Sequence, residues 1–225
     1  MKVLIFGKDK NKIYPLVKKT GFDIVEKNPE IVLSYGGDGT FIKSEDEFPG
    51  VRKVILKNSR ICKTCSKFSN KEVLKKIKEN KFVIKKLWKL EASVGNKKFY
   101  AINDIVVHNK NPLHGVRYEI YIDGKKTGGE IIGDGIVAAT SFGSTAYYRS
   151  ITGSFFESGI GLAFNNSTEP FDHVVLKENR EIKLKVLRGP AIVYADNQAE
   201  IADIGEGDEV FIKKSSKTAR ILSVY

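Results

Sequence analysis

Apolar residues over the first 85 positions fall into two patterns, short continuous runs and runs with helical spacing. The short runs predict buried strands, and apolar residues three or four positions apart predict amphipathic helices. The predicted strands cover 2–6, 22–26, 30–35 and 51–56, and the predicted helices cover 11–21 and 69–81. Ser69 and Glu72 give the second helix a capping-box start. Strands that alternate with helices favour a parallel, Rossmann-like α/β sheet.

The pattern changes at about residue 82, after which strand-like segments follow one another with few helix signals. The predicted strands are 82–94, 97–108, 116–123, 130–140, 181–187, 191–196, 208–214 and 219–225, and one helix is predicted at about 144–150. We therefore expect an α/β domain over 1–85 and a β-rich, β-sandwich-like domain over 86–225, whose C-terminal strand is able to return to the first domain.

Composition adds a bias towards anionic partners. The 225 residues carry a net charge of +11, from 38 basic and 27 acidic side chains. Such an excess favours nucleotides, polyphosphate or nucleic acid, although lysines spread over a solvated surface give the same total. No apolar stretch reaches the roughly 18 residues of a membrane span, and the N-terminus does not resemble a signal peptide. We expect a cytoplasmic protein without a membrane partner.

The cysteines Cys62 and Cys65 form a single CxxC pair. A zinc site needs about four ligands, and the chain has neither a second pair nor suitably spaced histidines. Three interpretations remain open: an incidental or structural pair, a redox pair, and a stapled loop.

The segment GGDGT, residues 36–40, follows a predicted strand and concentrates candidate chemistry in five residues. Glycine accepts positive φ and permits close approach to the main chain, whose N–H groups can receive phosphate oxygens. Asp38 suits either Mg²⁺ or the proton of an attacking hydroxyl; a tight turn with a solvated aspartate is the alternative. The segment is not a P-loop, because Ile42 replaces the glycine that should precede Lys43.

A second candidate stretch covers residues 133–153. Its opening GDGIVA fits a dinucleotide fingerprint, but a predicted strand follows where that fingerprint requires a helix. The strand ends at Thr140, and residues 143–146 then supply hydroxyl and N–H groups before Tyr147. Backbone amides beside an aromatic ring suit adenine or nicotinamide. A capped helix packed by a core tyrosine is the alternative.

These segments together resemble the NAD kinase family. GGDGT, Asn103-Asp104 before IVV, DGIVAAT before GSTAY, and Asp196 in VYADNQ occur in the family's order and spacing, over about residues 3–213. The resemblance implies an α/β domain followed by a β-sandwich-like domain, with the active site between them. It implies phosphoryl transfer from ATP or polyphosphate to the 2′-hydroxyl of the adenosine ribose of NAD. It also implies Mg²⁺ or another divalent cation, assembly as a dimer or tetramer, and no nucleic-acid partner.

The resemblance implies roles for individual residues. Asp38 matches the general base, and the phosphate-binding corner matches Gly36, Gly37, Gly39 and Thr40. The NAD-binding positions match Asn103, Asp104, Asp134, Thr145, Ala146, Tyr147, Ser150 and Asp196. No residue is assigned to a metal.

Three departures from the family pattern concern the ligand sites. Asp104 is one methylene shorter than the usual glutamate, Phe142 replaces a hydroxyl-bearing residue, and residues 58–63 replace the family's Asn-x-Gly-x-Leu-Gly loop. These changes keep two alternatives open. The first is a kinase for another hydroxyl-bearing small molecule or lipid, and the second is a non-catalytic binder of dinucleotide or nucleic acid.

Overall fold

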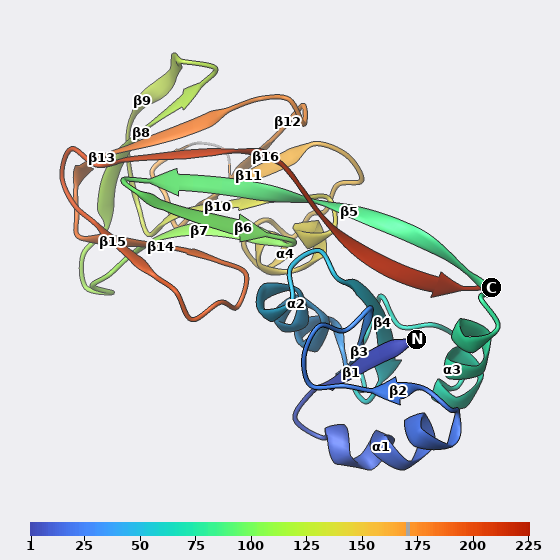
Figure 1. Cartoon of the computed structure of the whole chain (residues 1–225). Coiled ribbons are helices and arrows are strands. Elements are labelled where there is room, and N and C mark those ends of the chain that lie inside the picture. The colour runs from blue at the N-terminus through green and yellow to red at the C-terminus, as the bar shows by residue number, and fades with distance from the viewer. Residues whose placement is uncertain (170–171) are drawn as a thin grey trace. The chain divides into compact units, whose positions relative to one another are not determined.

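The computed structural model describes residues 1–169 and 172–225 (Figure 1). Within it the chain forms two compact units. The first unit contains Met1–Leu87 together with Lys217–Tyr225, and the second contains Trp88–Ser216.

The first unit is built on a parallel sheet with the strand order β2-β1-β3-β4. Its strands are β1 (Lys2–Phe6), β2 (Asp23–Ile24), β3 (Ile31–Gly36) and β4 (Arg52–Lys57). Its helices are α1 (Lys10–Lys19), α2 (Asp38–Glu47) and α3 (Asn70–Lys78). The C-terminal end of β16 (Glu209–Val224) extends this sheet by pairing parallel with β4.

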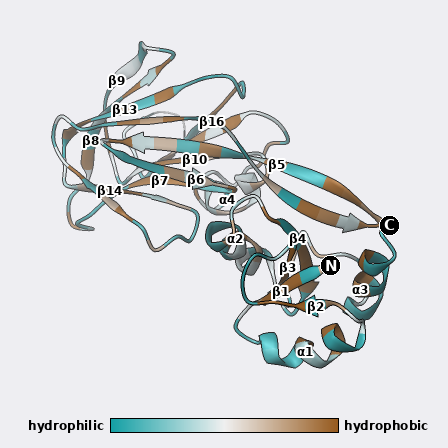
Figure 2. Ribbon diagram, viewed as in Figure 1, coloured by the Kyte–Doolittle hydropathy of each residue, from teal (hydrophilic) through white to brown (hydrophobic). Residues whose placement is uncertain are grey.

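Alternate residues of β1, β3 and β4 pack with α1 and α3 in one core, to which β16 adds Leu222. In α3 the predicted capping box is present, and the apolar residues Val73, Leu74 and Ile77 are buried. Helix α2 contacts β3 and β4, and Ser34 of β3 donates a hydrogen bond to the Ser44 hydroxyl of α2 at 2.6 Å. The hydropathy colours show apolar residues concentrated in β1, β3 and β4 (Figure 2).

Two antiparallel sheets make up the second unit. One has the order β12-β11-β10-β7-β14-β15. Its strands are β7 (Asp104–Asn109), β10 (Gly135–Ala139), β11 (Ile160–Asn165), β12 (His173–Leu176), β14 (Ala191–Ala195) and β15 (Ala202–Ile204). The other joins β16 to β13 (Ile182–Arg188), β8 (Val116–Ile122) and β9 (Lys125–Gly133). Strand β5 (Phe82–Val94) pairs with β6 (Lys97–Ala101) and with β16.

Side chains from both sheets of the second unit meet in one large core. Helix α4 (Tyr147–Thr152) packs on the opposite face of the β7–β10–β11 strands, where Tyr148 lies buried against Val106 and Val137. Strands β7 and β10 are therefore buried on both faces, which explains why their sequences are continuously apolar rather than alternating.

The structure also differs from several predicted elements. Helix α2 was not predicted, and neither were strands β11, β12 and β15. The segments 208–214 and 219–225 belong to one continuous strand, β16. The helix predicted at about 144–150 is divided into a 3₁₀ turn, η1 (Gly143–Thr145), and α4. Within the described ranges, no helix is both long and apolar enough to cross a membrane.

Candidate functional site

The GGDGT segment is a direct strand-to-helix junction. Strand β3 ends at Gly36, Gly37 is the N-cap, and Asp38 is the first residue of α2. None of Gly36, Gly37 and Gly39 has a positive φ, so backbone conformation does not require glycine here, contrary to one part of the sequence argument. Close approach does require it. A Cβ on Gly36 would lie 2.1 Å from Thr40 Oγ1, and one on Gly37 would lie 3.0 Å from Ser59 Cβ.

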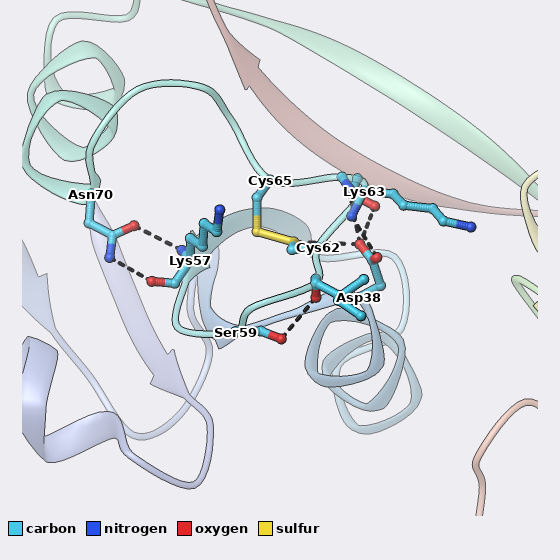
Figure 3. Close-up of a disulfide and its surroundings, with 9 residues drawn as sticks. Asp38, Lys57, Ser59, Cys62, Lys63, Cys65 and Asn70 are labelled. Carbon is cyan, nitrogen blue, oxygen red and sulfur yellow. Dashed lines mark hydrogen bonds between the residues drawn. A yellow bond between two sulfur atoms is a disulfide. The ribbon is translucent and has the colours of Figure 1, made fainter.

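Asp38 is half-buried and held by a neighbouring loop (Figure 3). Its Oδ2 accepts a hydrogen bond from the Lys63 backbone N–H at 2.8 Å. Its Oδ1 accepts bonds from the Thr64 backbone N–H at 3.1 Å and from Thr64 Oγ1 at 2.5 Å. A carboxylate at the N-terminus of a helix is also favoured by the helix dipole. The result is a fixed acid side chain beside the glycine junction.

Cys62 and Cys65 form a disulfide, so among the three interpretations of the pair the structure contains a stapled loop. The Cys62 sulfur lies 3.6 Å from Asp38 Oδ1. A disulfide sulfur carries no proton, so this is a contact rather than a hydrogen bond. Sequence reasoning missed Lys63 and Thr64, because nothing in their residue types indicates contact with an acid some 25 positions earlier.

The second unit holds two neighbouring acids, of which Asp104 is buried and Asp196 is half-buried. Asp196, with φ 49°, follows β14 and accepts hydrogen bonds from three consecutive backbone N–H groups, those of Ile102, Asn103 and Asp104, at 2.8, 2.8 and 3.1 Å. Burial raises the pKa of Asp196 to about 6 against the opposing effect of these bonds. Burial raises the pKa of Asp104 to about 7, and the charge of Asp196 adds to the shift. Near neutral pH the pair therefore shares less than two full charges.

Tyr147 lies within electrostatic range of both Asp104 and Asp134. Burial raises the pKa of Tyr147, and the charges of Asp104 and Asp134 contribute further. Its hydroxyl accepts a hydrogen bond from Asn165 Nδ2 at 3.4 Å. Asp134 accepts hydrogen bonds from the side-chain amides of Asn109 and Asn166, each at 3.2 Å. The charges of Asp104 and Asp134 therefore both act on the Tyr147 hydroxyl.

The backbone of residues 140–146 is anchored to Asn103. The Thr140 N–H donates to the Asn103 carbonyl at 2.8 Å, and a Cβ on Gly143 would lie 2.2 Å from that same oxygen. Thr145 closes the 3₁₀ turn, and Ala146 is the N-cap of α4. Ser150 is exposed and its hydroxyl donates to the Tyr147 carbonyl within the same helix.

Tyr194 of β14 is a member of this group that sequence reasoning missed. Burial raises its pKa to about 12, with Tyr147 and Asp104 as further causes. The sequence showed that Tyr194 lies in a predicted strand with alternating side chains. It did not show which face of the sheet packs against α4.

The described residues contain no group of three or more His, Cys, Asp or Glu side chains arranged to hold a metal ion. Asp38, beside the glycine junction, already accepts three hydrogen bonds on its two oxygens. This arrangement does not form a protein cage for a cation. It does fit a cation carried mainly by substrate phosphates, which is the usual binding mode of Mg²⁺ at phosphoryl-transfer sites.

Comparison with known proteins identifies the same family as the motifs. Residues 102–224 match the family model of the ATP-NAD kinase C-terminal domain. The chain is 32% identical to an NAD kinase from Fusobacterium nucleatum over 97% of this chain and 90% of that protein. It is 29% identical to a bifunctional NADP phosphatase/NAD kinase from Methanococcus maripaludis, covering 88% of this chain but only 37% of the relative.

A solved structure confirms the fold. An NAD kinase from Archaeoglobus fulgidus, crystallised with ATP, superposes with a TM-score of 0.83 at 20% identity, covering all of this chain and 94% of that one. The predicted fold class, an α/β part followed by a β-rich part, is thus confirmed. The two alternatives, another hydroxyl kinase and a non-catalytic binder, find no support in these comparisons.

Proposed function

The chain belongs to the NAD kinase family, and from that premise we propose that it transfers a phosphoryl group to the 2′-hydroxyl of the adenosine ribose of NAD, forming NADP. ATP or polyphosphate is the donor. The observation that carries the proposal is the GGDGT junction, where an oriented carboxylate stands at a helix N-terminus.

The donor phosphates bind at this junction in our proposal. Gly36, Gly37, Gly39 and Thr40 form the junction into α2, and the dipole of that helix favours anions at its N-terminus. Among the described residues, no atom lies within 4 Å of a Cβ added to Gly39, which supports close approach of a ligand to the main chain. Bound together with these phosphates, Mg²⁺ or another divalent cation would offset their charge.

Asp38 orients the attacking hydroxyl and accepts its proton. A carboxylate offers about four acceptor positions, and the loop occupies three of them, leaving capacity on Oδ2. In a loose phosphoryl-transfer transition state the hydroxyl gives up its proton late, so alignment by Asp38 matters more than strong basicity.

NAD is held by the residues of the second unit. Asn103 and Asp104 bind its adenosine half, and Asp134 lies towards the nicotinamide end. Thr145, Ala146, Tyr147, Ser150 and Asp196 complete this group. The support is local: the charges of Asp104 and Asp134 both raise the pKa of Tyr147, and Asp196 accepts hydrogen bonds from the Asn103 and Asp104 backbone N–H groups. A dimer or tetramer is the assembly we propose, which light scattering after size exclusion tests.

The first test supplies NAD, ATP or polyphosphate, and Mg²⁺, and detects NADP with an NADP-specific dehydrogenase. Heat-inactivated protein is the control. Replacing Asp38 with Asn keeps the side-chain shape but removes the charge, and we expect kcat to fall by about 100-fold or more with NAD affinity retained. Absence of NADP from folded wild-type protein defeats the proposal, and equal kcat in Asp38→Asn removes that residue from the catalytic role.

A further inference from the structure

The segment between β4 and α3 lies against the catalytic acid of the proposed function. Residues 58–69 contain no helix or strand. Their two ends are joined where the Lys57 N–H donates to Asn70 Oδ1 at 2.8 Å and Asn70 Nδ2 donates to the Lys57 carbonyl at 3.0 Å. Within this closed loop, the Cys62–Cys65 disulfide makes a second, smaller ring (Figure 3).

The smaller ring contains the groups that hold Asp38. Only Lys63 and Thr64 stand between the two cysteines, and these two residues donate all three hydrogen bonds that Asp38 accepts from the loop. Both backbone donors reach the same carboxylate from within the four-residue ring that the disulfide closes. Gly37 permits the approach from the other side, since a Cβ there would lie 3.2 Å from the Ile61 carbonyl oxygen.

We propose that Thr64 is a positioning residue for Asp38, and that the Cys62–Cys65 disulfide keeps Thr64 in place, so that reducing this disulfide slows phosphoryl transfer. The inference rests on the proposed function, since it concerns the acid assigned there as the base. It assigns a role to a residue that the family motifs do not contain.

The hydrogen-bond pattern explains how Thr64 acts. Oδ1 of Asp38 takes both Thr64 bonds, whereas Oδ2 takes only the Lys63 bond. The carboxylate is thereby held in one rotation, with Oδ2 as the oxygen that has an acceptor position for the substrate hydroxyl. Without the Thr64 hydroxyl, Oδ1 keeps only the Thr64 backbone bond, and the acid is free to rotate further. Because misplacement of a reacting group by about 1 Å costs up to roughly 100-fold in rate, the effect falls on kcat rather than on NAD binding.

The redox step is balanced by an added dithiol. The Cys62–Cys65 bond takes two electrons and two protons from a dithiol such as dithiothreitol, giving two thiols on the chain, while the dithiol closes to its cyclic disulfide. The chain has only these two cysteines, so a dithiol has a single target in this protein. Reduction opens the ring, and Lys63 and Thr64 are no longer held in one turn.

The first experiment measures kcat, KM for NAD, and NAD affinity for Thr64 variants. Thr64→Val keeps the shape but removes the hydroxyl, and we expect kcat to fall about tenfold with little change in NAD affinity. Thr64→Ser restores the hydroxyl and recovers most of the loss, which a purely structural role for the methyl group would not allow. Thr127→Val, at an exposed position of β9, is the matched control. Unchanged kcat in Thr64→Val overturns the positioning role.

The second experiment compares wild type with the Cys62→Ser, Cys65→Ser double variant, each with and without dithiothreitol. Mass spectrometry after thiol alkylation counts the free thiols. We expect dithiothreitol to lower the wild-type kcat about tenfold and to leave the double variant unchanged at the lower rate. Equal or faster turnover of the fully reduced wild type overturns the role of the disulfide. If neither redox state of the wild type forms NADP, the proposed function itself has failed, which is a distinguishable result.

Discussion

At the scale of single residues, Asp196 shows how one side chain organises a ligand-binding segment. The backbone N–H groups of three consecutive residues, Ile102, Asn103 and Asp104, all donate hydrogen bonds to its carboxylate. Hydrogen bonds of this kind to a charged acceptor are stronger than those between neutral groups. The Asn103–Asp104 backbone is thereby fixed, and the shorter Asp104 side chain stays buried next to a second acid.

This burial predicts a pH-dependent stability. The pKa of Asp104 rises from 3.8 to about 7 on folding, so its contribution is present at low pH and is lost as pH rises from about 4 to about 7. Asp104→Asn removes the charge. We expect the variant to gain about 1–3 kcal/mol in unfolding free energy relative to wild type between pH 5 and pH 8. Urea unfolding at several pH values measures this difference.

The exposed Asp46 of α2 offers the matched control, since Asp46→Asn removes a charge without removing a buried one. A difference between Asp104→Asn and wild type that stays constant from pH 5 to pH 8 would contradict the raised pKa.

At the scale of elements, the glycines of the β3–α2 junction serve two different purposes. Gly36 avoids a clash within the protein, and in our proposal Gly39 leaves room for a ligand. Gly36→Ala places a methyl group 2.1 Å from Thr40 Oγ1, and we expect it to lower the unfolding free energy by about 1–3 kcal/mol. Gly39→Ala meets no atom of the described residues within 4 Å and lies in a helix, so we expect a gain of about 0.5–1 kcal/mol. Under the proposed function, Gly39→Ala nevertheless lowers turnover, because its methyl group occupies the approach to the main chain.

Unfolding in urea and NADP formation, measured on the same preparations, test this contrast. A destabilised Gly39→Ala variant would show that Gly39 has a packing role, and full turnover would show that no ligand approaches the main chain there.

The elements that sequence reasoning identified are those whose burial follows a simple period. Helix α3 has its apolar residues on one face and a capping box at its start, and β5 was predicted with its observed limits. Helix α2 was not predicted because its buried face includes polar residues. Ser44 is bonded to Ser34, and Glu45 forms a buried ion pair with Lys53 of β4. Where buried positions hold polar side chains that are hydrogen-bonded or ion-paired to distant residues, the apolar spacing that predicts a helix is absent.

The candidate site divides in the same way. Sequence motifs predicted the glycine junction, Asp38 and the acids of the second unit, because those residues lie in short segments of unusual composition. The partners of Asp38 in the 58–69 loop depend on how a segment without periodicity folds back, and on whether two cysteines join. Such contacts are set by tertiary structure, which local patterns do not record.

At the scale of the whole molecule, β16 links the end of the chain to its beginning. Its first residues pair antiparallel with β13, whereas Arg220 and Ile221 pair parallel with β4. The last nine residues, Lys217–Tyr225, belong to the first unit. The core of that unit is therefore incomplete until the final residues have been added, although most of its strands lie among the first 57 residues.

A cavity at Leu222 tests this dependence. Leu222 is 4% exposed and packs in the core formed by β1, β3, β4, α1 and α3, so we expect Leu222→Ala to lower the unfolding free energy by about 2–4 kcal/mol. Leu113→Ala makes the same change at a side chain that is 83% exposed, and we expect an effect within about 0.5 kcal/mol. Urea unfolding followed by circular dichroism compares the two. Equal effects would mean that the C-terminal strand adds little to the first unit, whereas a selective loss at Leu222 means that this parallel sheet depends on the last residues of the chain.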